Sequence, residues 1–172
     1  EVMSLGRTFE ESFLKGIRSL ETKVDYLYME KFDCVETSEL LNQIEVPTDE
    51  RIFMIAELLR RGITTEVINE RTMIDLFFLN KINGIIEFEK EFKENQSLDN
   101  FIKAKKLGFS DQYLAKVMGM SELDVYKYRK EHNIYPVYKM IDTCAAEYDA
   151  YTPYFYSTYD TENESIVSDK EK

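Results

Sequence analysis

Serine and glycine residues divide the second half of the chain into short units, and this spacing constrains the fold more than any other feature. Three runs of helix-forming residues follow one another there, each preceded by a serine: Ser97, Ser110 and Ser121. Serine is a preferred N-cap because its hydroxyl accepts a hydrogen bond from a free amide of the first helical turn. The first two runs end at Gly108 and Gly119, and glycine readily adopts the left-handed conformation that closes a helix. The sequence therefore predicts three consecutive short helices, the last ending near Asn133.

Apolar residues also recur at helical spacing through the first half of the chain. The segments predicted to be helical are 8–20, 37–44, 49–61, 64–70 and 73–94. Thr8 and Glu11 have capping-box spacing, Thr37 or Ser38 is the expected cap of the second segment, and Thr48 or Asp49 that of the third. Gly62 is expected to close the third segment. Residues 21–35 lack periodicity and are predicted to form a loop.

The longest predicted helix, 73–94, has one regular apolar side. The residues expected on its buried face are Ile74, Phe78, Ile82, Ile85 and Phe92. Gly84 lowers helix stability by about 1 kcal/mol relative to alanine. We interpret this glycine as a place where another helix packs closely.

The charge balance limits the partners of the chain. Its 172 residues include 22 Lys and Arg and 33 Asp and Glu, for a formal net charge of −11. Such a chain is repelled by phosphate backbones and anionic lipid headgroups, and no apolar run approaches the roughly 20 residues that span a bilayer. We predict a soluble cytoplasmic protein with no nucleic-acid or membrane partner. Both ends are expected to continue into a longer chain.

Residues able to perform chemistry are few and scattered. The chain contains no Gly-rich phosphate loop, no G-x-S-x-G and no H-E-x-x-H motif. His132 is the single histidine and is expected to lie at a helix end. Cys34 and Cys144 are far apart, and no base for a cysteine nucleophile accompanies Cys144. The paired carboxylates fall where first helical turns are predicted: Glu10 with Glu11, and Asp49 with Glu50. We predict no catalytic, cofactor-binding or metal-binding residue.

The character of the sequence changes after Asn133. Residues 135–160 are rich in tyrosine, threonine and β-branched residues, which favour extended segments packed on the helical body. Five tyrosines cluster near the end of this stretch: Tyr148, Tyr151, Tyr154, Tyr156 and Tyr159. Acidic rather than basic residues separate them, which favours packing against a neighbouring domain or subunit over stacking on nucleic acid.

Residues 110–131 resemble a helix-turn-helix. Ala115 lies four residues before Gly119, and Val125 lies six residues after it, a spacing that lets two helices cross closely. The segment 101–132 has an excess of three positive charges. Against DNA binding, the first turn of the second helix would present Glu122 and Asp124 to a polyanion. A helix-turn-helix DNA-binding module is the alternative function, and a structural helical corner is the favoured interpretation.

Three stretches together resemble one enzyme family. The first stretch is residues 1–12 and ends with Gly6-Arg7-Thr8-Phe9-Glu10-Glu11-Ser12. The second is Gly108-Phe109-Ser110-Asp111, which leads into Leu114-Ala115. The third is residues 135–159, which contain Asp142-Thr143-Cys144-Ala145-Ala146-Glu147 and Tyr154-Phe155-Tyr156-Ser157-Thr158-Tyr159. Their order resembles the large subunit of carbamoyl phosphate synthetase, in the oligomerization or connection domain between its two ATP-grasp halves.

The resemblance implies a mainly α, irregular multi-helix domain with an extended C-terminal segment. It implies four parts: 1–7 as the end of a preceding ATP-grasp unit, 8–134 as the helical domain, 135–160 as an extended segment packed on it, and 161–172 as a linker to the next synthetase half. The family's ATP, Mg²⁺ or Mn²⁺ and substrate residues lie outside this chain. The implied function is therefore non-catalytic and structural.

The implied parent enzyme is a ligase that makes carbamoyl phosphate from bicarbonate, glutamine-derived ammonia and two ATP, for arginine and pyrimidine synthesis. The implied partners are the flanking ATP-grasp domains of the same chain, other large subunits through self-association, and the glutaminase small subunit bound by the parent.

Overall fold

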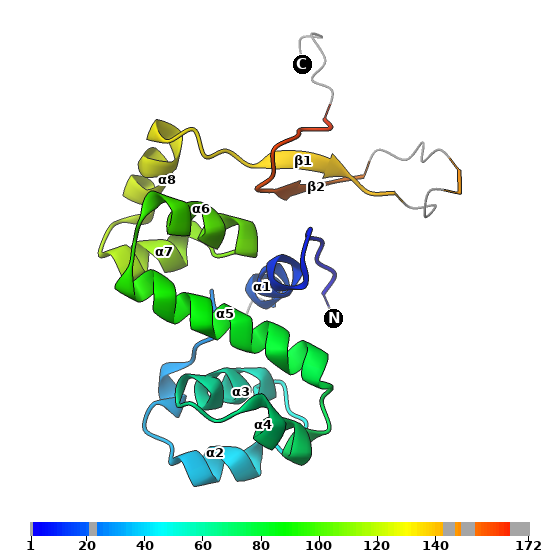
Figure 1. The fold of residues 1–172 in the computed structure, drawn as a ribbon, viewed down its shortest axis with the longest axis vertical. Coiled ribbons are helices and arrows are strands. Elements are labelled where there is room, and N and C mark those ends of the chain that lie inside the picture. The colour runs from blue at the N-terminus through cyan, green and yellow to red at the C-terminus, as the bar shows by residue number, and fades with distance from the viewer. Residues whose placement is uncertain (1, 21–23, 143–146, 149–153, 166–172) are drawn as a thin grey trace.

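Helices form the body of the protein in a computed structural model, which describes residues 2–20, 24–142, 147–148 and 154–165 (Figure 1). Over those residues the α-helices are α1 (Phe9–Ser19), α2 (Thr37–Gln43), α3 (Arg51–Arg60), α4 (Thr65–Thr72), α5 (Leu76–Glu94), α6 (Leu98–Leu107), α7 (Asp111–Met118) and α8 (Glu122–Glu131). In the same described residues, a 3-10 turn (Glu30–Phe32) precedes α2, and the strands β1 (Val137–Met140) and β2 (Phe155–Thr158) follow α8. The predicted mainly α fold with an extended C-terminal segment is confirmed.

The long helix α5 crosses the middle of the molecule and separates two groups of helices (Figure 1). Helices α3 and α4 pack on one side of it, with α2 against α3. Helix α6 packs on the other side and leads into the α7–α8 pair. Helix α1 contacts both α5 and α6, so it joins the start of the chain to the centre of the body. No helix among the described residues is long and apolar enough to cross a membrane.

The serine caps expected in the second half of the chain are confirmed. The side chains of Ser97, Ser110 and Ser121 accept hydrogen bonds from backbone amides in the first turns of α6, α7 and α8. Gly108 and Gly119 close the first two of these helices at φ +93° and +65°. Only glycine adopts such angles without steric cost, so the sequence determines these helix ends locally.

Other predicted helix starts were wrong in detail. Helices α2 and α3 begin after Glu36 and Glu50, and neither residue provides a side-chain cap. The longest helix starts at Leu76, three residues later than predicted, because Met73 takes a left-handed conformation that ends α4. Asp75 then caps α5 by accepting a hydrogen bond from the amide of Phe77.

Two expectations about α5 were also wrong. The Phe78 side chain, predicted to be buried, is 46% exposed, whereas Ile82 and Ile85 on the same side of the helix are buried. Phe78 lies in the first turn of α5, where its ring contacts Phe9 of α1 but is only partly covered. A Cβ atom added to Gly84 would meet nothing within 4 Å, so no close helix contact exists there.

The predicted loop between α1 and α2 contributes to the core despite its lack of periodicity. Tyr26, Leu27 and Phe32 are at most 5% exposed. The Tyr26 ring stacks on Tyr113 of α7 with a centroid distance of 3.9 Å and packs against Phe109 at 5.3 Å. Aromatic contacts of this kind stabilise beyond simple area burial. The irregular segment between α1 and α2 therefore contributes side chains to the hydrophobic core, as the helices do.

Strands β1 and β2 pair antiparallel, with Val137 opposite Thr158 and Met140 opposite Phe155, and the hairpin extends away from the helices (Figure 1). Its base is seated on α1. Thr158 Oγ1 donates to the buried Glu11 carboxylate at 3.0 Å, and Lys15 Nζ donates to the Ser157 carbonyl at 2.5 Å. The predicted linker, 161–172, is described only to residue 165, and this part runs along β1.

Candidate functional site

Two of the three residues considered for nucleophilic or metal chemistry lie apart on the surface. His132 is the C-cap of α8, as expected, with its ring against Tyr128. Cys34 is exposed in the loop before α2, and Cys144 lies outside the described residues. No group of three or more His, Cys, Asp or Glu suited to a metal ion occurs among the residues that the structure describes.

The paired carboxylates take part in bonds between elements. Glu10 pairs with Lys81 of α5 at 3.1 Å, and Glu50 pairs with Lys31. Glu11 is 2% exposed and accepts hydrogen bonds from the Arg7 amide and from Thr158. Glu10, Glu11 and Glu50 therefore each hold a partner in another part of the fold.

The helical corner predicted at residues 110–131 is present. Helices α7 and α8 pack together, Ala115 is 4% exposed, and Val125 is fully buried. Two of the basic residues that suggested DNA binding point inward, since Lys105 and Arg129 are at most 8% exposed and both pair with Asp111. The outer surface of this segment is therefore less basic than its sequence indicates.

The Lys105–Asp111–Arg129 cluster links α6, α7 and α8 and contacts Tyr159, the residue after β2. Lys105 Nζ lies 2.7 Å from Asp111 Oδ1, and Arg129 lies 2.7 Å from Asp111 Oδ2. Burial lowers the pKa of Lys105 to about 8, against the opposing attraction of Asp111. The Tyr159 ring, just after β2, faces both cations at 4.9 and 5.9 Å. Cation–π contacts of this geometry are favourable.

The tyrosines near the C-terminal end divide into two groups. Tyr159 packs against the core, whereas Tyr148 and Tyr154 are 77% and 58% exposed. Tyr156 is half-buried beside Lys15, with the ammonium 5.7 Å from its ring centroid. Tyr151 lies outside the described residues. The predicted packing of these tyrosines on a neighbour remains a prediction for the exposed pair.

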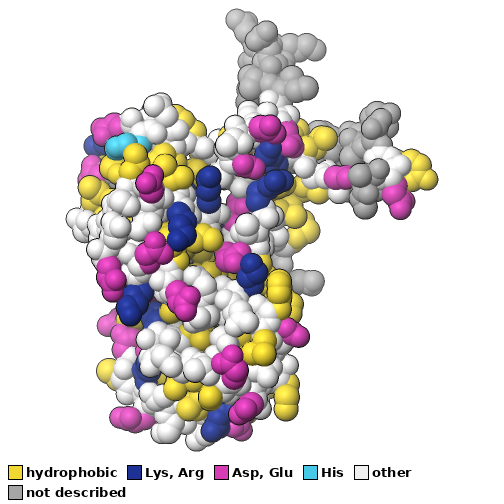
Figure 2. Space-filling model, viewed as in Figure 1, with side chains coloured by type: hydrophobic (Ala, Val, Ile, Leu, Met, Phe, Trp, Pro, Cys, Tyr) yellow, Lys and Arg dark blue, Asp and Glu magenta, His cyan; other side chains and the backbone are white. Residues whose placement is uncertain are grey.

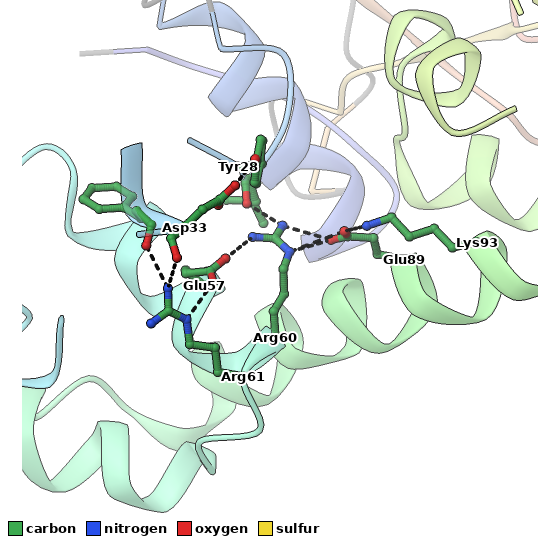
Figure 3. A network of polar contacts seen from close by, with 9 residues as sticks. Tyr28, Asp33, Glu57, Arg60, Arg61, Glu89 and Lys93 are labelled. Atoms are coloured by element: carbon green, nitrogen blue, oxygen red, sulfur yellow. Dashed lines mark hydrogen bonds and ion pairs between the residues drawn. The ribbon is translucent and has the colours of Figure 1, made fainter. Parts of the chain in front are cut away.

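A second polar network joins α3 to α5 (Figure 3). Arg60 lies against Glu89 with a shortest N–O distance of 2.9 Å, and Arg60 also donates to the Leu27 carbonyl. Lys93 approaches the same carboxylate from the next turn of α5. Burial alone would raise the pKa of the Glu89 carboxyl, but the two cations outweigh it and hold that pKa below its usual range.

The neighbouring arginine extends this network to the irregular segment. Arg61 pairs with Glu57 of its own helix at 2.8 Å (Figure 3). It also donates to the carbonyls of Phe32 and Val35. Together Arg60 and Arg61 donate hydrogen bonds to backbone carbonyls of the irregular segment between α1 and α2. Sequence patterns did not reveal this network, because the partners are up to 33 residues apart.

An apolar surface remains where α1 meets the first turn of α5. We call it the α1–α5 surface, and it comprises Val2, Phe9, Phe13, Leu20, Phe77 and Phe78. Val2, Leu20, Phe77 and Phe78 are between 39% and 56% exposed. In Figure 2 hydrophobic side chains lie along the right-hand edge, where α1 and the start of α5 meet in Figure 1.

The α1–α5 surface contains both a groove and a projection. Phe9, Phe13, Gly16 and Leu20 recur at the 4-3-4 spacing of a helix stripe and line a groove of about 340 Å³ with Val2 and Ser4. Phe9 stacks on Phe13 at 5.3 Å between centroids and contacts Phe77 and Phe78 at 6.3 and 5.7 Å. The first turn of α5 therefore extends the wall of the groove.

Comparison with protein families gives one match over most of the chain. The family model described as "Carbamoyl-phosphate synthetase large chain, oligomerisation domain" matches residues 1–133. This range includes α1 to α8 and the whole α1–α5 surface, whereas the β1–β2 hairpin follows it.

Proposed function

The chain belongs to the family of carbamoyl-phosphate synthetase large-chain oligomerisation domains, and from this premise we propose that it associates with copies of itself and performs no chemistry of its own. As a member of that family it is a structural domain of a synthetase. ATP use is a property of the parent enzyme. The proposal concerns how this domain contributes to the assembly.

The use of buried charge carries the proposal. The charged side chains buried in the described part of the chain are all bonded to another part of it: Glu11, Glu89, Lys105, Arg129 and Lys139. Catalytic sites instead hold perturbed ionisable groups free to face a substrate. Charge placed in this way supports a scaffold, in which ion pairs fix the elements relative to one another.

We extend the proposal to the neighbours of the domain. Residues 1–7 are the end of a preceding ATP-grasp unit, and 161–172 are a linker to the next synthetase half. The parent binds a glutaminase small subunit, works in the cytoplasm, requires Mg²⁺ or Mn²⁺ with its ATP, and serves arginine and pyrimidine synthesis. The contact between β2 and α1 supports the proposed places of residues 1–7 and 161–172, because it holds the first and last parts of the domain next to each other.

Sedimentation velocity over a range of concentrations tests the proposal. We expect the weight-average sedimentation coefficient to rise with concentration, and thermal unfolding to be unchanged by millimolar ATP with Mg²⁺. A chain that stays monomeric throughout would contradict self-association. A clear ATP-induced rise in the unfolding temperature would contradict the absence of a nucleotide site, since ligands that bind the folded state stabilise it.

A further inference from the structure

We propose that Arg18 of α1 is the centre of a binding site for a doubly charged oxyanion of the phosphate class, at the point where the first and last parts of the domain meet. Such a site is independent of self-association. It adds a ligand to a domain that performs no chemistry of its own.

Arg18 lines two cavities at the junction of α1 with the hairpin. The larger one, of about 410 Å³, is bounded by Ser4 and Leu5 of the first segment and by Ser157 of β2. The smaller one, of about 240 Å³, lies toward the turn after α6. Cavities that hold small ligands are commonly about 300–1,000 Å³. Of the described residues that line the larger cavity, Lys15 and Arg18 are cationic and none is acidic.

The ion pairs around Arg18 leave positive charge uncompensated. Three carboxylates lie close enough to attract its guanidinium, namely Glu11, Asp111 and Asp25. Each of them already has a cationic partner, and the pairs are Glu11 with Lys15, Asp25 with Lys116, and Asp111 with both Lys105 and Arg129. Five cations therefore meet three carboxylates in this region, although the chain as a whole has a net charge of −11. This local surplus attracts an anion.

The guanidinium of Arg18 has donors to spare. Its Nη1 donates to the Gly108 carbonyl at 2.6 Å, and among the described residues it forms no ion pair. Burial lowers the pKa of Arg18, against the attraction of Glu11. A partly buried cation without a carboxylate partner costs free energy, which a bound anion recovers. The planar fork of N–H donors on arginine matches two oxygens of a phosphate group.

The size of the charge surplus favours a phosphate group over a carboxylate. A surplus of two positive charges matches a phosphate group, which carries about −1.5 to −2 at neutral pH. The larger cavity is also lined by Met3 and Leu5, so it has room for the organic part of a phosphate monoester as well as for free phosphate. Because Ser4 and Ser157 line this same cavity, the ligand would touch both the first and the last part of the domain.

Titration of the isotope-labelled chain with inorganic phosphate, followed by amide NMR, tests the site. We expect saturable shifts in the millimolar range for the amides of Ser19, Gly108 and Ser157, which belong to residues lining the two cavities. Glycerol phosphate should shift the same amides, and tighter binding of this ester would identify a phosphate monoester as the better ligand. Acetate at matched ionic strength should bind at least about tenfold more weakly, because it has a single charge.

Three variants locate the binding. Arg18→Gln removes the fork of donors and should weaken phosphate binding at least about tenfold. Arg51→Gln is the matched control and should leave binding unchanged: Arg51 also donates to two backbone carbonyls, at 2.6 and 3.2 Å, but it lines neither cavity. Ser157→Asp places a carboxylate at an exposed position in the wall of the larger cavity, and should abolish phosphate binding by pairing with Arg18. Circular dichroism checks the helix content of each variant.

Equal phosphate affinity in the wild type and in a folded Arg18→Gln variant would overturn the site. If Arg18→Gln does not fold, Ser157→Asp decides: unchanged affinity overturns the site, and loss of binding supports it. Shifts that do not saturate, or that gather away from the two cavities, mean nonspecific attraction to basic side chains and also overturn it. Acetate binding as tight as that of phosphate overturns the assignment to a doubly charged oxyanion.

These outcomes are separate from those of the proposed function. Sedimentation velocity measures self-association whether or not phosphate binds. A ligand at a concentration near its dissociation constant stabilises the folded state only slightly. Millimolar phosphate binding therefore does not produce the clear rise in unfolding temperature that would reveal a nucleotide site.

Discussion

Replacing Gly108 with alanine tests the contact between α1 and the turn that follows α6. Gly108 has φ +93°, and a Cβ atom added to it would lie 2.9 Å from the Glu11 Cα and 3.1 Å from the Glu11 carbonyl oxygen. Arg18 Nη1 also donates to the Gly108 carbonyl at 2.6 Å. The substitution therefore strains the local backbone and pushes α1 away from the body.

Gly119 supplies a matched control for the first effect alone. It closes α7 at φ +65°, and an added Cβ atom would meet nothing within 4 Å. Placing alanine in the left-handed region costs about 1–2 kcal/mol at either glycine. Carbon atoms prefer separations of roughly 3.5–4.0 Å, so Gly108→Ala must also move α1 or the turn. Overpacking of this kind adds about 1–3 kcal/mol.

Urea unfolding followed by helical circular dichroism measures both variants. We expect Gly119→Ala to lower the free energy of unfolding by about 1–2 kcal/mol, and Gly108→Ala by roughly 2–5 kcal/mol once overpacking is included. These are large fractions of the about 5–15 kcal/mol that stabilises a typical domain. Equal losses in the two variants would refute the close approach of α1 to Gly108.

Three further predictions concern buried ionisable groups. Glu89→Gln should destabilise the fold by roughly 3 kcal/mol in urea unfolding, because it leaves Arg60 buried without its carboxylate, whereas the exposed Glu91→Gln should cost less than about 1 kcal/mol. The folded-state pKa of Glu89 is depressed, so its contribution to the free energy of unfolding is present above the unfolded pKa of about 4.3 and is lost as pH falls through the folded value. Stability should therefore be measured from about pH 6 down to about pH 3, which brackets the unfolded pKa of about 4.3. Over this range it should fall more steeply in the wild type than in Glu89→Gln. Burial raises the pKa of Tyr26 and Tyr113 above the usual tyrosine value, so stability should fall above about pH 10, and absorbance near 295 nm should register these two phenols only as the helix signal is lost.

Local signals explain which parts of the fold the sequence could predict. A serine cap or a left-handed glycine acts within one helical turn, so α6, α7 and α8 follow from their own residues. Whether Phe78 is buried depends on how far a neighbouring helix covers the start of α5. The periodicity of apolar residues along α5 contains no information about its neighbours. The core position of Tyr26 had no signal at all, because an irregular segment has no period to read.

The polar networks show the same limit. Arg60 and Glu89 lie on different helices 29 residues apart, and only the packing of α3 on α5 brings them together. The basic excess at residues 101–132 gave a partial signal for function, but two of its cations, Lys105 and Arg129, are turned inward to Asp111. The family resemblance predicted a structural role for the domain. The chemistry of its residues showed only that no catalytic or metal-binding motif could be recognised in the sequence.

The seat of β2 on α1 also determines how the domain responds to tension. Thr158 bonds to Glu11 across 147 residues of chain, and Arg7 pairs with Asp160 at 3.4 Å, so the two segments that pass in and out of the helical body touch each other. A force that pulls the two segments apart acts first on these contacts. The contacts at the base of the hairpin, and not the packing of α2 to α8, are therefore the first part of the domain to meet a pull between these two segments.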